Sequence, residues 1–135
     1  MINVTLPKRG SDDWGSGEYG ASRGNRTHKG IDYECPVKAL LHSPVDGEIT
    51  KLGYPYADDM SYRYIEITDK EGYRHRLFYV EPYVTYEQQI EEGDFIGVVQ
   101  DVAGKYNKQG KGTMKNHVHY EILTQAGIPV NPEEF

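Results

Sequence analysis

Two short patterns of histidine and carboxylate side chains in this sequence have the types and the spacing that metal chemistry requires. The first, His28-Lys-Gly-Ile-Asp32, places an imidazole and a carboxylate four residues apart around a glycine. The second, His117-Val-His119, places two imidazoles at positions i and i+2. Alternate side chains of a β-strand point to the same face, so His117 and His119 would share one surface if this stretch is extended. Histidine and aspartate both bind zinc, so the two patterns together indicate a metal centre.

A zinc ion that catalyses hydrolysis usually has three protein ligands and one position open to water. His28, Asp32 and one of the two strand histidines would supply that set, and the other histidine would lie beside the metal as a base or a donor. The residues alone leave open whether His117 or His119 is the ligand. Either pattern alone is common in proteins that bind no metal. The two patterns occur together in a chain with only five histidines, and this favours a metal centre.

The remaining two histidines, His42 and His75, are predicted to have no part in this centre. His42 lies in Leu-Leu-His-Ser-Pro without an acidic neighbour, so we expect it to be structural or exposed. His75 lies in an alternating run and is predicted to be a partly buried strand histidine.

The elements that must position these side chains are predicted to be short strands. Alternating runs with abundant tyrosine and valine indicate an all-β fold, and the predicted strands cover residues 47–52, 62–68, 73–80, 95–99 and 117–123. Asp69-Lys-Glu-Gly72 joins the second and third of these strands as a β-hairpin. Residues 85–92 are the one weak helical candidate. The lysine-rich stretch 105–115 is predicted to be solvated surface or a loop at the mouth of a site. We predict one domain over 1–135, with an irregular arm over 1–22 that is rich in glycine and serine.

Composition limits the possible partners of the chain. Its 15 basic and 21 acidic residues give a net charge of −6, which argues against a uniformly basic nucleic-acid-binding protein. The chain has no apolar run of about 18 residues, so no membrane partner is expected. A single cysteine, Cys35, excludes a disulfide framework within the chain. The N-terminus lacks the pattern of a signal peptide, so we expect synthesis in the cytoplasm without export by the general secretory route.

With these motifs in this order, the sequence resembles the lysostaphin-type (LytM-like) zinc endopeptidases, which cut peptide stems or cross-bridges of bacterial peptidoglycan. Arg26-Thr-His-Lys-Gly-Ile-Asp32 is similar to the first metal motif of that family, and Asn116-His-Val-His-Tyr-Glu-Ile122 is similar to its His-x-His-aromatic-Glu signature. Tyr19-Gly-Ala-Ser-Arg23 resembles the approach to the first ligand, and Val130-Asn-Pro132 fits the usual ending. The resemblance implies antiparallel sheets that form a groove with a zinc site.

The resemblance also assigns roles to the residues of the two motifs. His28, Asp32 and His119 would ligate zinc. His117 would lie beside the catalytic water, as its base or as a stabiliser of the tetrahedral intermediate.

One position departs from the family pattern. The family usually carries a second catalytic histidine where this chain has Glu81, in Phe78-Tyr-Val-Glu-Pro82. A carboxylate can act as a general base at a zinc site, so Glu81 could replace that histidine. The alternative is that the site keeps the metal and has lost catalysis. The leukocyte cell-derived chemotaxin branch of the family resembles this chain at the same strand.

The function expected from this resemblance is zinc-dependent hydrolysis of peptide bonds in the bacterial cell wall, by a monomeric enzyme of phage or prophage origin (an endolysin). Its substrate would be peptidoglycan peptide, and it would act at the cell wall or in the periplasm. The alternative function is that of a catalytically silent zinc-binding module that recognises a cell-wall peptide or a protein partner.

Overall fold

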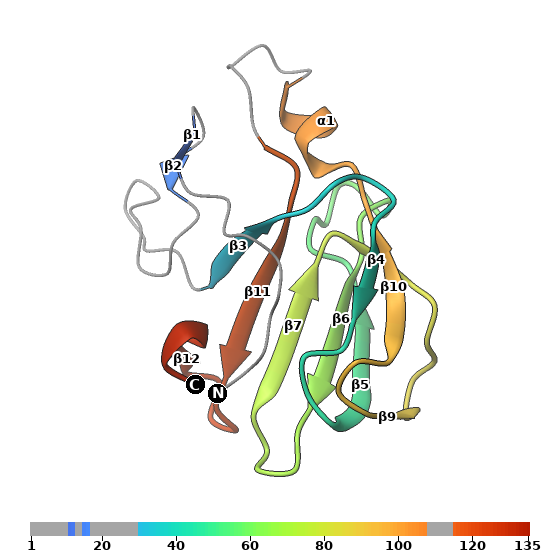
Figure 1. Ribbon diagram of the computed structural model, residues 1–135, viewed down its shortest axis with the longest axis vertical. Helices are drawn as coiled ribbons and strands as arrows, with labels where there is room; N and C mark the ends of the chain where they lie inside the picture. The colour runs from blue at the N-terminus through green and yellow to red at the C-terminus, as the bar shows by residue number, and fades with distance from the viewer. Residues whose placement is uncertain (1–10, 13–14, 17–29, 108–114) are drawn as a thin grey trace.

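The computed structural model describes residues 11–12, 15–16, 30–107 and 115–135. Within these ranges the chain is mostly β-structure, with one short α-helix and a final 3₁₀ turn (Figure 1). The elements are β1 (Ser11–Asp12), β2 (Gly15–Ser16), β3 (Ile31–Glu34), β4 (Leu40–His42), β5 (Gly47–Gly53), β6 (Tyr64–Thr68), β7 (Arg74–Phe78), β8 (Val80–Pro82), β9 (Gln89–Ile90), β10 (Phe95–Val99), α1 (Val102–Asn107), β11 (His117–Leu123), β12 (Pro129–Val130) and η1 (Pro132–Glu134). The predicted all-β fold of antiparallel sheets is confirmed.

Two antiparallel sheets carry most of these strands. In the large sheet the order is β12-β11-β7-β6-β5-β9, and β3 pairs with β11. In the small sheet the order is β4-β10-β8. Figure 1 shows β11, β7, β6 and β5 side by side, with β3 next to β11 and with β4 and β10 in front of the other end of the large sheet. The strand β11 therefore lies between β3, which pairs with its residues 117–120, and β7, which pairs with its residues 119–123.

The hydrophobic core lies between the two sheets. The large sheet contributes Ile49, Ile65, Leu77 and Ile122, and the small sheet contributes residues such as Ile96, all of them buried. These residues alternate with more polar ones along their strands, which is the pattern expected when one face of a sheet is buried.

In β11 the alternation places core side chains on one face of the sheet and the two histidines on the other. Val118, Tyr120 and Ile122 are at most 1% exposed and belong to the core. His117 and His119, offset by one position, therefore point to the opposite face of the large sheet.

The predicted hairpin is confirmed between β6 and β7. The backbone N–H of Asp69 donates to the carbonyl of Tyr73 at 2.9 Å, and the Asp69 side chain accepts from the N–H groups of Glu71 and Tyr73 at 3.0 Å. Gly72 has a φ of +88°, a conformation that glycine adopts without steric cost.

Tyr79 marks the point at which the chain leaves the large sheet and enters the small one. It lies between β7 and β8 and has a φ of +72°, which is uncommon for a residue with a side chain. The N–H groups of Tyr79 and Val80 both donate to the carbonyl of Arg63, at 2.8 and 3.1 Å. The alternation predicted to run unbroken through residues 73–80 is therefore interrupted at Tyr79.

The helix predicted over residues 85–92 is wrong. This segment forms turns and the short strand β9, and the residues before β9 pair with β5 through Glu87 N–H to Ile49 carbonyl (2.7 Å) and Ile49 N–H to Gln88 carbonyl (2.9 Å). Pairing with a neighbouring strand thus prevails over a weak local helical preference.

The helix α1 begins just before the lysine-rich stretch. Its first turn is capped by Asp101, whose carboxylate accepts from the N–H of Gly104 at 2.7 Å. Lys105 lies in this helix, whereas residues 108–114 lie outside the described part of the chain. No helix in the described ranges is long and apolar enough to cross a membrane.

Candidate metal centre

Pairing of β3 with β11 brings the two sequence patterns together. The register places Asp32 directly opposite His119 and Glu34 opposite His117. The Nδ1 atom of His119 lies 2.8 Å from Oδ1 of Asp32, and Nε2 of His117 lies 3.7 Å from Oδ2 of the same carboxylate. Asp32 is 3% exposed. One buried carboxylate therefore faces both strand histidines, although His119 is 87 positions away from it in the sequence.

Both ring nitrogens of His119 face carboxylates. Its Nε2 atom lies 3.0 Å from Oε1 of Glu121, opposite the contact of Nδ1 with Asp32. Burial disfavours the charged ring, but the hydrogen bonds and negative charges of Asp32 and Glu121 outweigh burial and raise the pKa of His119 from 6.5 to about 9. The ring of Phe78, directly opposite in β7, packs edge-on against His119 at 5.2 Å. The imidazole is thus held on three sides.

His117 is oriented by the backbone. Its Nδ1 lies 2.9 Å from the carbonyl oxygen of Lys115, which can only accept, so Nδ1 carries a proton. The basic nitrogen of the neutral ring is therefore Nε2, on the side of Asp32. Tyr79 packs edge-on against this ring, with the centroids 5.6 Å apart.

The donor chemistry of this cluster fits a metal ion. When a neutral His119 carries its proton on Nε2, where it donates to Glu121, its Nδ1 can only accept. Nδ1 and the Asp32 oxygen are then two acceptors 2.8 Å apart, which requires a proton or a cation between them. Carboxylate oxygen and imidazole nitrogen are ligands of zinc. The described ranges hold no group of three or more converging ligand side chains. The third predicted ligand, His28, lies outside these ranges.

Among the described residues, Glu81 makes no direct contact with this cluster. Its side chain is exposed on β8, where it is paired with Val98 of β10. It lines a shallow hollow of about 260 Å³ together with residues that include Tyr62 and Asp101. The Tyr62 ring packs against Tyr79 at 6.3 Å, and Tyr79 in turn contacts His117. The catalytic role of Glu81 stays a prediction.

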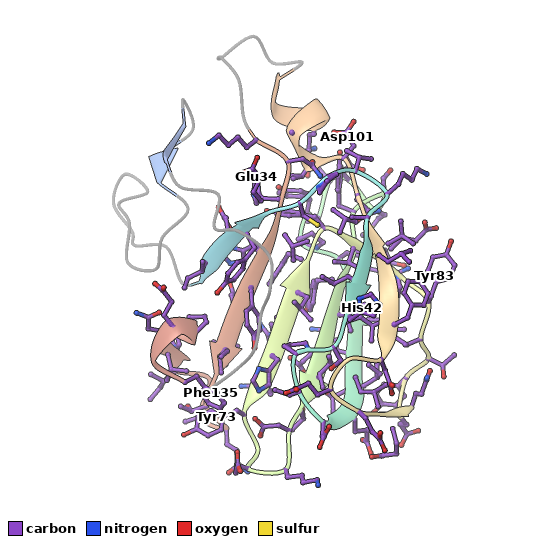
Figure 2. The ribbon with its side chains drawn as sticks, viewed as in Figure 1. Glu34, His42, Tyr73, Tyr83, Asp101 and Phe135 are labelled. Atoms are coloured by element: carbon purple, nitrogen blue, oxygen red, sulfur yellow. The ribbon has the colours of Figure 1, made fainter. Side chains whose placement is uncertain are left out.

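Two residues of the second motif, to which the sequence analysis assigned no role, support the cluster. Glu121 contacts His119, and strand alternation alone would have placed it on the same face. Asn116 joins three segments around the cluster, because its side-chain NH₂ donates to the carbonyls of Cys35 (2.9 Å) and Gln100 (3.0 Å) and its oxygen accepts from Ala103 N–H at 3.0 Å. No rule of sequence spacing predicts that Asn116 would make these contacts. Figure 2 shows the labelled Glu34 and Asp101, which flank these segments, at one end of the molecule.

The other two described histidines lie elsewhere. His42 is exposed on β4, with its ring edge-on to Phe95 at 6.3 Å. His75 is completely buried, more deeply than predicted, with Nδ1 2.7 Å from the Tyr120 hydroxyl and Nε2 2.8 Å from Oδ2 of Asp69. Phe135 packs edge-on against His75 and against Tyr73, and Figure 2 shows the labelled Tyr73 and Phe135 together.

The chain is similar in sequence to known proteins. The family described as Peptidase family M23 matches residues 26–132. Leukocyte cell-derived chemotaxin-2 from Mus musculus is 26% identical over 113 residues, which cover 84% of this chain and 71% of the mouse protein.

Similar solved structures share the fold at low identity. The structure of LytU has a TM-score of 0.69 at 18% sequence identity, and the match covers 100% of this chain and 88% of the LytU chain. The catalytic domain of a mutant of the prophage-encoded M23 protein EnpA from Enterococcus faecalis has a TM-score of 0.68 at 16% identity, over 98% of this chain and 93% of its own. A zinc-containing peptidase from Vibrio cholerae has a TM-score of 0.62 at 23% identity, over 85% of this chain. The chain spans only 34% of that peptidase and 31% of Helicobacter pylori Csd3.

Proposed function

The chain belongs to peptidase family M23, and from this membership we propose that it is a zinc-dependent endopeptidase that hydrolyses peptide bonds in bacterial peptidoglycan. The observation that carries the proposal is the contact of buried Asp32 with both His119 and His117, at 2.8 and 3.7 Å. These are the three described residues to which the family resemblance gives metal or catalytic roles. The zinc-containing peptidase among the similar structures supports the choice of metal.

Asp32 and His119, together with His28, would hold the ion. When bound, zinc supplies a Lewis acid that polarises the scissile carbonyl and lowers the pKa of water. The chain itself supplies proton transfer. Because the Lys115 carbonyl fixes the proton on Nδ1 of His117, Nε2 can take a proton from the attacking water. As the C–N bond breaks, the same nitrogen can return that proton to the leaving amine.

We propose Glu81 as a second proton acceptor at the mouth of the site. The support is indirect: its hollow is bounded by Tyr62, which contacts Tyr79 and through it His117. Glu81→Gln keeps the shape and removes the base, so it should slow wall lysis strongly, whereas Glu81→His should preserve or raise the rate. Equal rates of lysis for both variants and the parent would make Glu81 a bystander.

The cellular setting belongs to the same proposal. A prophage-encoded protein among the similar structures supports a phage or prophage origin. The enzyme would then be made in the cytoplasm as a monomer and would act on peptidoglycan peptide at the cell wall or in the periplasm.

Zymography on purified cell wall, with and without a chelator, tests this function. We expect a zone of clearing that disappears with chelator and returns with added zinc. Clearing that persists after zinc is confirmed to be removed would contradict a zinc enzyme.

A second candidate function is a zinc-binding module without catalysis. Glu81 at the position of the family's usual histidine and the 26% identity to a chemotaxin favour it. This module would bind a cell-wall peptide or a protein partner. It predicts no lysis by the parent, together with retained binding to cell walls, and lysis by Glu81→His would then support a site that lacks only one group.

A further inference from the structure

Charged side chains of alternating sign lie across the large sheet next to the candidate metal centre. Glu66 of β6 is directly opposite Arg76 of β7, and Arg76 is directly opposite Glu121 of β11. Glu121 in turn contacts His119, two positions away on the same strand face. We call Glu66, Arg76 and Glu121 the charged ladder. It ends at the imidazole that faces Asp32.

The far end of the charged ladder is rigidly held. Glu66 is 5% exposed, and its two carboxylate oxygens accept from Arg76 Nε at 2.8 Å and from the Thr50 hydroxyl at 2.9 Å. The guanidinium of Arg76 also lies 5.8 Å from the centroid of the Tyr64 ring. A buried carboxylate with both oxygens engaged fixes the position of Arg76.

The near end of the charged ladder fixes His119. Residues directly opposite in an antiparallel pair have Cβ atoms about 5 Å apart, so Arg76 and Glu121 are neighbours on one face of the large sheet. An ionised carboxylate only accepts hydrogen bonds, so the nitrogen 3.0 Å from it, Nε2 of His119, must carry a proton. The lone pair of the neutral ring is then on Nδ1, which faces Asp32 at 2.8 Å.

We infer that Glu121 is a positioning residue of the candidate metal centre: it fixes the tautomer and direction of the His119 ring through the contact of Oε1 with Nε2 at 3.0 Å. Carboxylates that accept from the second nitrogen of a metal-bound histidine raise its basicity and orient its ring. The inference rests on the proposed zinc function.

The zinc dissociation constant of the full chain, measured by competition with a chromophoric chelator, tests the inference. Loss of such a carboxylate typically weakens metal binding 10- to 100-fold, so we expect that loss for Glu121→Ala. Glu121→Gln should lose less, because its amide oxygen can still accept from Nε2–H. The control is Glu48→Gln, on β5 of the same sheet, where Glu48 accepts from Gln89 at 2.7 Å and zinc affinity should be unchanged.

A second measurement separates positioning from a purely structural role. With Co²⁺ in place of zinc, the visible absorption bands should shift in Glu121→Ala and stay unchanged in Glu48→Gln. Glu121→Ala and Glu121→Gln with the zinc affinity and the Co²⁺ spectrum of the parent would overturn the inference and leave the proposed function standing. A parent that binds no zinc would overturn both.

Discussion

His75 and His119 lie on neighbouring strands of the large sheet, on opposite faces, and each has partners at both ring nitrogens. Their pKa values nevertheless move in opposite directions. Burial lowers the pKa of His75 from 6.5, although Asp69 partly opposes it. The pKa of His119 is raised to about 9 in spite of burial.

The difference lies in the second partner. A neutral His75 satisfies both contacts, because Nε2–H donates to Asp69 and Nδ1 accepts from the Tyr120 hydroxyl. A neutral His119 satisfies only one of its two carboxylates, Asp32 and Glu121. A hydroxyl can donate and a carboxylate cannot, so His75 is complete by itself, whereas His119 requires a second proton or a cation. One partner group thus distinguishes the structural histidine from the proposed zinc ligand.

The largest difference between the two histidines should appear when each imidazole is removed. His119→Ala should abolish wall hydrolysis and weaken zinc binding more than about 100-fold, beyond the usual cost of changing an outer partner. His75→Ala should lower the melting temperature and leave the zinc content of the folded protein unchanged. Metal analysis of both purified variants is the measurement. One tightly held equivalent of zinc in His119→Ala would refute the ligand assignment.

A second prediction distinguishes the roles of His117 and His119 in the candidate metal centre. His117→Ala should keep the zinc affinity and slow turnover by about 10²–10⁴, the usual cost of a lost acid–base group. Turnover of a soluble cell-wall peptide and zinc affinity, measured on the same preparation, check this. A His117→Ala protein without zinc would mean that His117 and His119 have exchanged roles.

Because the pKa values of His119 and His75 move in opposite directions, the two residues should make the free energy of unfolding change with pH in opposite directions. In the metal-free protein, His119 contributes to the free energy of unfolding fully below pH 6.5, and this contribution, up to about 3 kcal/mol, is lost as the pH rises through about 9. The contribution of His75 is present above pH 6.5 and is lost as the pH falls below that value.

Urea unfolding of the metal-free parent, His119→Gln and His75→Gln between pH 5 and 10 would measure these slopes. The alkaline decline should be absent in His119→Gln and the acidic decline absent in His75→Gln. An alkaline decline of the same size in the parent and in His119→Gln would contradict the assignment.

The smallest predicted effect concerns the hydroxyl that completes His75. Tyr120→Phe leaves Nδ1 of buried His75 without its donor, so it should destabilise the fold by about 1–3 kcal/mol and leave zinc binding unchanged. The control Tyr73→Phe changes a ring that packs on Phe135 and should have little effect. Equal stability for both variants would show that the Tyr120 hydroxyl contributes nothing.

Much of the architecture could be predicted from alternation alone. The strand predicted over 117–123 and the hairpin at 69–72 agree with β11 and with the β6–β7 turn. In both cases the signal is local, because one face of the strand is buried and a short turn fixes the register. The kink at Tyr79 could not be predicted, since a tyrosine carries no preference for a positive φ and the cause is a contact with distant Arg63.

The candidate centre was less accessible to sequence reasoning. The pairing of Asp32 with His119 follows from the β3–β11 register, and no local pattern specifies which strands pair. The family resemblance supplied that pairing. The partner carboxylate Glu121 and the charged ladder behind it were missed, because a charged residue in an alternating strand is indistinguishable from a solvated one until the neighbouring strand is known.

The alternation of β11 also has a genetic consequence. In seven successive residues, His117–Leu123, odd-numbered positions carry the histidines and Glu121, and even-numbered positions fill the core. Deletion or insertion of a single codon within this strand would reverse the direction of every side chain on one side of the change relative to the other side, because a shift of one residue exchanges the two faces. We therefore expect this segment to tolerate conservative substitutions in its core face better than any change of length.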